Sequence, residues 1–120
     1  MVTEDYVSFE TAKLLKEKGF DEPCVYVYRH DGSEDIWNAD KEDIACQKPT
    51  LQRAMKWLRN TFHLEIYPFH DAVQENNDWW YRIERHSKGC SLTEHESDVI
   101  YKTYEQACEA AIKYCLENLI

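Results

Sequence analysis

A long amphipathic pattern at the C-terminal end limits the folds that are open to this chain. Apolar residues recur there at spacings of three and four: Tyr104, Ala107, Cys108, Ala111, Ile112, Cys115, Leu116 and Leu119. This spacing places them along one face of a helix, and a stripe of that width has to be buried against another element. Thr103 and Gln106 fit a capping box at its start. The sequence therefore predicts a helix from Tyr104 to about Leu119 that packs on a sheet.

Two further helices are predicted upstream by their capping residues. Ser8 precedes a helix over residues 9–18, which ends at Gly19, a residue suited to the left-handed conformation after a helix. Thr50 precedes a second helix, whose apolar stripe is Leu51, Ala54, Met55, Leu58 and Phe62. All three helices begin with Ser or Thr, an apolar residue, Glu or Gln, any residue and then Ala. Capping alone explains this pattern, and an internal repeat is the alternative.

Strands are predicted between the helices. Residues 24–30 are β-branched and aromatic, and residues 63–69 and 79–86 form a hairpin around a polar tip. Residues 99–101 read as a short further strand. Pro68 indicates that its strand lies at a sheet edge or carries a bulge, because proline has no backbone N–H to donate. The predicted fold is α+β, with an antiparallel sheet of about four strands and three helices in the order α-β-α-β-β-β-α.

Length and composition indicate one cytoplasmic domain over residues 1–120. A chain of 120 residues with 43% hydrophobic residues can bury one core. The first residues are acidic and polar, unlike a signal peptide, and no apolar run reaches the length of a membrane span. The cysteines number five, an odd count, which favours free thiols in a reducing compartment.

The charge balance argues against nucleic-acid binding. There are 14 Lys and Arg against 23 Asp and Glu, a formal net charge of −9, and phosphate is repelled by such a surface. Residues 50–120 read in the element order of a double-stranded-RNA-binding domain. That module needs lysines at the start of its last helix, where this chain has Glu105 and Glu109. We therefore expect neither nucleic acid nor a membrane as a partner.

Two segments carry a resemblance. Residues 55–59 read Met-Lys-Trp-Leu-Arg, and residues 103–107 read Thr-Tyr-Glu-Gln-Ala in a helix that runs to a Leu-Ile ending. Together with residues 6–20, they resemble a widespread group of short uncharacterised proteins encoded by phages and mobile elements of gut Bacteroidales. The group has no established activity, so the resemblance implies a biological setting and no chemistry.

Two patterns approach metal sites, and both are incomplete. Four residues have the spacing of EF-hand ligands: Asp31, Ser33, Asp35 and Glu42. Ile36, however, stands where that loop needs glycine. Three residues offer zinc-type ligands in a polar stretch, His86, Cys90 and His95, but a closed zinc site needs a fourth. We predict no metal and no cofactor, and the zinc pattern stays open.

The sequence assigns no catalytic residue. It contains no Gly-x-Ser-x-Gly turn, no glycine-rich phosphate loop and no Walker lysine. With three glycines in the chain, a backbone nest for phosphate is hard to build. We therefore predict a protein that is not an enzyme, with a small enzyme lacking any recognisable motif as the third alternative.

Aromatic residues on the predicted hairpin point to a partner site. Because side chains alternate along a strand, Trp80 and Arg82 lie on the face opposite Trp79, and Tyr67 and Phe69 lie opposite Leu64 and Ile66 on the other strand. If these faces coincide, they form a patch of aromatic residues and arginine, the residue types that anchor protein interfaces. The alternative is that the first helix or strand 24–30 covers this face.

The acidic segment between residues 31 and 43 adds a second feature. Asp35, Asp40 and Asp43 are expected to steer a basic partner by long-range attraction. The predicted function is a non-enzymatic protein of phage or mobile-element origin that binds a host or phage protein, with counter-defence as its sharpest form. Sequestration of a nucleotide between Trp80, Arg82 and Arg85 is the alternative. A homodimer through the sheet face is a further arrangement that we keep open.

Overall fold

The computed structural model describes residues 5–36, 41–71 and 78–120, and its fold is α+β. The helices are α1 (Phe9–Glu17), α2 (Leu51–Phe62) and α3 (Tyr104–Tyr114), with a 3-10 turn η1 (Lys41–Asp43) and a π-helical continuation of α3, η2 (Cys115–Leu119). The strands are β1 (Tyr26–Arg29), β2 (Glu34–Ile36), β3 (Ile44–Lys48), β4 (Leu64–Asp71), β5 (Asp78–Ser87) and β6 (Cys90–Glu96). None of the described helices has the length and apolar character that crossing a membrane requires.

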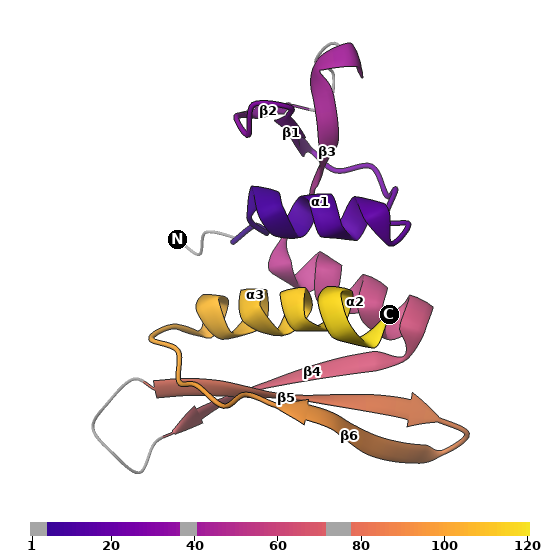
Figure 1. The fold of residues 1–120 in the computed structure, drawn as a ribbon, viewed down its shortest axis with the longest axis vertical. Helices are drawn as coiled ribbons and strands as arrows, with labels where there is room; N and C mark the ends of the chain where they lie inside the picture. Colours follow the sequence, from indigo (N-terminus) through magenta and orange to yellow (C-terminus); the bar gives the residue numbers. More distant parts are fainter. Residues whose placement is uncertain (1–4, 37–40, 72–77) are drawn as a thin grey trace.

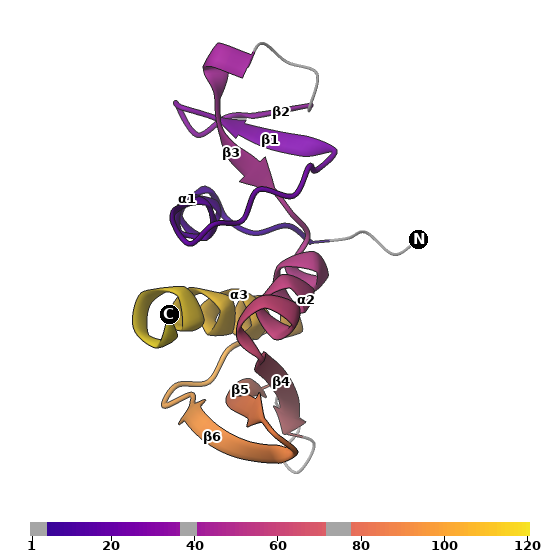
Figure 2. The same cartoon turned by 90° about the vertical axis from the view of Figure 1, so that its right-hand side faces the viewer.

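The elements form two small antiparallel sheets with helices between them (Figures 1 and 2). One sheet has the strand order β2-β1-β3 and the other β4-β5-β6. Helix α1 packs on β3, while α2 and α3 pack on one face of the second sheet. The second sheet therefore has an inner face toward the helices and an outer face at the end of the molecule.

The prediction of one sheet with about four strands is wrong, because the strand near residues 24–30 has partners of its own. Tyr26 pairs with Ile36 of β2 and with Lys48 of β3. The acidic segment over residues 31–43, for which no strand was predicted, contains β2, and β3 follows it. With these local partners, β1 forms a separate sheet, and the element order becomes α-β-β-β-α-β-β-β-α.

The third strand of the second sheet is also not the predicted one. Residues 99–101 contribute a single bridge, between Tyr101 and Trp79. The place beside β5 is taken by β6, a polar segment that turns back after Lys88 and Gly89. Its residues are mostly exposed and lack an alternating apolar pattern, so the hydrophobic signal for this strand is weak.

The three predicted helix starts are confirmed. The side chain of each N-cap residue accepts a hydrogen bond from a backbone N–H three positions later: Ser8 from Thr11, Thr50 from Arg53 and Thr103 from Gln106. Gly19 follows α1 with φ of 103°, a left-handed value that glycine adopts without strain. The capping signals therefore located the helices to within a residue or two.

The C-terminal stripe is the centre of the core, as predicted. Residues of α3 and η2 pack with α2 and with the inner face of the second sheet. The members exposed by at most 1% are Ala54, Leu58, Leu64, Ile83, Ala107, Cys108, Ala111, Ile112, Cys115 and Leu116. Pro68 lies in β4, an edge strand, as its missing N–H indicates.

Candidate functional site

The predicted aromatic residues meet on the second sheet. Phe69 lies opposite Trp80 in the pairing of β4 with β5, and Tyr67 lies opposite Arg82. The rings of Phe69 and Trp80 stack with centroids 4.6 Å apart and planes 22° apart. The Arg82 guanidinium lies 5.0 Å from the Phe69 ring centroid and 5.7 Å from that of Tyr67. We call these four residues the sheet patch.

The sheet patch lies on the outer face. Its neighbours along β5, Tyr81 and Ile83, are 3% and 0% exposed because they point toward the helices. Figures 1 and 2 show α2 and α3 on that inner face, with α1 and β1 beyond them. No helix or strand of the described ranges covers the outer face, so the interpretation that the first helix or strand 24–30 covers it is wrong.

The Arg82 guanidinium is held in place by a neighbouring carboxylate as well as by the rings. Its Nε lies 2.9 Å from Glu84 Oε2, an ion pair on the same strand. That Nε is nevertheless buried and makes no hydrogen bond of good geometry with any described atom. Beside it, burial raises the pKa of Tyr67, whose hydroxyl lies 3.4 Å from His86 Nε2. Arg82 is thus held among aromatic rings and beside Glu84, in the kind of surroundings that arginine has at interface anchors.

The predicted acidic residues lie far from the sheet patch. Asp35 belongs to β2 and Asp43 to the turn η1 before β3, both at the opposite end of the molecule (Figure 1). The Asp35 carboxylate accepts a hydrogen bond from Arg29, which lowers its pKa. Asp40 lies outside the described residues. The predicted partner residues therefore occupy two separate surfaces.

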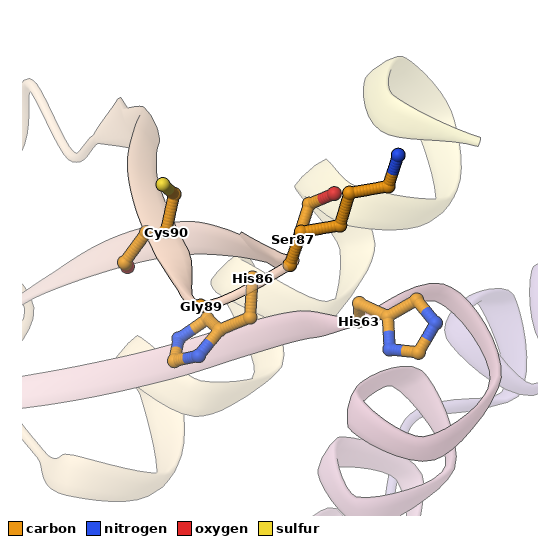
Figure 3. Close-up of a pocket in the computed structure, with 7 residues that line it drawn as sticks. His63, His86, Ser87, Gly89 and Cys90 are labelled. Atoms are coloured by element: carbon orange, nitrogen blue, oxygen red, sulfur yellow. The ribbon is translucent and has the colours of Figure 1, made fainter.

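A hollow of about 540 Å³ lies at the β5–β6 turn (Figure 3). It is lined by His63, His86, Ser87, Lys88, Gly89, Cys90 and Ser91. Figure 3 shows the Cys90 thiol and the His86 ring pointing to opposite sides, with His63 further along. A thiol nucleophile needs its base within hydrogen-bond reach, and these two side chains diverge.

The three residues of the zinc-type pattern, which the sequence left open, do not come together. His95 stacks on Tyr114 with ring centroids 3.7 Å apart, on the helix side of the sheet. His86 points to the outer face, where it meets Tyr67. Within the described ranges, no three side chains of His, Cys, Asp or Glu gather closely enough to hold a metal ion.

The first sheet also contains a buried lysine that is not among the predicted site residues. Lys48 is 7% exposed, and its Nζ lies 2.5 Å from Glu34 Oε1. Its Nζ also lies 4.8, 5.4 and 5.8 Å from the ring centroids of Tyr6, Tyr28 and Tyr26. The sequence pattern that could have indicated this contact is the spacing of Tyr26 and Tyr28, which places both rings on one face of β1. The Glu34 carboxylate and the three tyrosine rings together compensate the buried charge of Lys48. Because Tyr6 is one of these rings, the contact also holds the N-terminal segment against the first sheet.

The cysteines are free, and four of them are buried. Burial raises the pKa of Cys108 to about 11 and of Cys115 to about 12, and it also raises the pKa of Cys24 and Cys46. Because the thiolate is the reactive form, these thiols should react slowly.

We expect Ellman's reagent at about pH 8, near the ordinary thiol pKa, to titrate one thiol rapidly in the native protein, that of exposed Cys90. All five should react in guanidinium chloride. A Cys90→Ser variant should lose the rapid phase. Rapid reaction of two or more thiols in the native wild type would contradict the buried positions of the other four.

Comparisons of the chain with protein-family models, with curated proteins and with solved structures find no match. A function has to come from the residues and their arrangement.

Proposed function

We propose that this protein is a non-enzymatic binding protein whose sheet patch contacts a basic surface of a partner protein. The observation that carries the proposal is the presence of three aromatic rings and an arginine on an uncovered sheet face. Aromatic and arginine side chains contribute most of the binding free energy at many interfaces. A strand-borne patch is also rigid, so little conformational entropy is lost on binding.

Charge favours a basic partner. The net charge is −9, and the outer face around the patch carries Glu96 together with Glu65 and Glu84, which form ion pairs with Arg59 and Arg82. Lysine and arginine of a partner can contact these carboxylates and the faces of Trp80 and Phe69. Asp35 and Asp43 contribute to the long-range field from the other end of the molecule without touching the patch.

The biological setting that the resemblance implies makes the proposed partner more specific. The resemblance to phage and mobile-element proteins favours a host factor in the bacterial cytoplasm as the partner. Nucleic-acid-binding proteins present basic surfaces, and an acidic protein can occupy such a surface as a decoy. Inhibition of a host immunity factor is therefore the sharpest form of this function.

Nucleotide sequestration receives less support. The residues considered for it were Trp80, Arg82 and Arg85. The Arg85 guanidinium instead donates to the backbone carbonyls of Phe62 and Leu119, 3.4 and 3.0 Å away on the helix side. Of the two arginines considered for a phosphate clamp, Arg82 alone lies on the outer face.

The test is affinity capture from host lysate with three baits: wild type, Trp80→Ala and Ile36→Ala. Ile36 is 48% exposed at the opposite end, so its variant is a control for loss of apolar surface. A protein captured by wild type and Ile36→Ala should bind Trp80→Ala at least about tenfold more weakly by surface plasmon resonance, through a faster off-rate. Equal affinity for Trp80→Ala would contradict the proposal, as would calorimetric binding of a nucleotide in place of a protein.

A further inference from the structure

The two sheets of the described residues have four edge strands, and three of these are protected against pairing with another strand. β4 contains Pro68, which lacks a backbone donor. On β3, the Ala45 carbonyl accepts a hydrogen bond from Lys16 Nζ at 2.6 Å, and α1 packs alongside. β2 has only three residues. Proline, lysine, short length and covering elements are the usual means of blocking edge strands.

The first half of β6 lacks these protections. The strand pairs with β5 on one side, and no other described strand pairs with it. Figure 2 shows it at the outer edge of the sheet. Its second half carries a register shift and the acids Glu94 and Glu96, whereas residues 90–93 are uncharged and contain no proline. In their midst Leu92 is 69% exposed, an unusual state for a leucine on an open edge.

We propose that a second copy of this chain pairs with this edge, antiparallel and related by a two-fold axis at Leu92. In this register Leu92 meets its own copy, Ser91 lies opposite Thr93, and Cys90 lies opposite Glu94. No like charges are directly opposed. A register centred on Thr93 would instead place each leucine opposite Glu94, an apolar group against a charge.

Pairing joins the β4-β5-β6 sheet of one copy to the same sheet of the other copy, which gives one continuous sheet. A two-fold axis perpendicular to the sheet keeps both outer faces on the same side, so two sheet patches face one direction. The dimer is inferred from the edge and Leu92 alone and does not depend on the proposed function. If both hold, a partner with two equivalent sites gains avidity from the dimer.

Sedimentation velocity over a concentration series at about 0.15 M salt, where charge repulsion between copies is screened beyond about 8 Å, tests the association. A short edge buries little area, so we expect a dissociation constant on the order of 10–100 µM. Leu92→Lys should raise it at least about tenfold, because an interface core residue is replaced by a charge. The control is Val99→Lys, the same kind of change at a residue that is 55% exposed outside β6. A wild-type protein that stays monomeric at about 1 mM, well above that range, overturns the proposal.

Cysteine cross-linking tests the register. In a Cys90→Ser background, Leu92→Cys places two thiols on the axis, where facing Cα atoms of a non-hydrogen-bonded pair are about 4.5 Å apart, within the range of disulfides. Mild oxidation should link this variant at least about tenfold faster than Val99→Cys in the same background, since effective concentrations within a complex reach the millimolar range. Equal rates for the two variants, or association unchanged by Leu92→Lys, would exclude the β6 edge.

Discussion

Replacing Ile112 with Asp is expected to unfold the protein. Ile112 is 0% exposed in α3, which packs on β4 and β5 and contacts both other helices. An unpaired carboxylate at this position would have to be buried or protonated, at a cost of several kcal/mol. Small domains are stable by about 5–15 kcal/mol in total, and loss of the isoleucine packing adds about 2–5 kcal/mol to the penalty. Thermal denaturation followed by far-ultraviolet circular dichroism should show no cooperative transition.

Asn118→Asp provides the matched control for Ile112→Asp. It adds the same charge in η2, only six positions along the chain, but at an exposed side chain. Asn118→Asp also loses the hydrogen bond that Asn118 Nδ2 donates to the Tyr114 carbonyl at 3.3 Å, so we expect a cost of about 1 kcal/mol, well below that of Ile112→Asp. A cooperative transition in Ile112→Asp at the temperature of Asn118→Asp would refute the central position of the C-terminal stripe.

The helices could be predicted because their signals are local. Each has a capping residue within three positions of its first N–H donors, and the α3 stripe repeats often enough to fix its buried face. The stripe also required a sheet to cover it. That sheet exists, and its inner face carries the Tyr81 and Ile83 side chains, which alternation along the strand places opposite Trp80 and Arg82.

The division into two sheets could not be predicted because strand pairing is not local. β2 has three residues and lies in an acidic segment, so neither propensity nor alternation marks it. β6 likewise has almost no buried residues. Such strands form because a neighbouring strand supplies hydrogen-bond partners, and the neighbour is known only once the chain is folded.

The candidate site could likewise be predicted only where local patterns determine it. Period-two alternation correctly placed Trp80 with Arg82, and Tyr67 with Phe69, on common faces. Whether another element covers that face depends on where α1 and the first sheet pack, which the sequence left open. The separation of Asp35 from the sheet patch could not be predicted for the same reason, because Asp35 lies in β2, which belongs to the other sheet.

Removal of the Glu109 carboxylate should give the second large loss of stability. Glu109 Oε1, on α3, accepts hydrogen bonds from the Ser8 backbone N–H at 3.1 Å, from the Thr11 hydroxyl at 2.6 Å and from the Ser8 hydroxyl. These donors lie at the N-terminus of α1, where a negative charge also interacts favourably with the helix dipole. One carboxylate thus joins the start of the first helix to the last helix.

Glu109→Ala should lower the free energy of unfolding by about 3 kcal/mol. Each hydrogen bond to a charged group contributes about 1.5–3 kcal/mol, water can replace part of that contribution at Ser8, and the Thr11 hydroxyl is left without its carboxylate acceptor in a residue that is 0% exposed. Glu109→Gln keeps an oxygen at the same place and should lose about half as much, because the acceptor remains and the charge is lost. Urea denaturation with Glu117→Ala as control checks both values, since Glu117 is exposed. A loss in Glu109→Ala no larger than in Glu117→Ala would show that α1 does not depend on this contact.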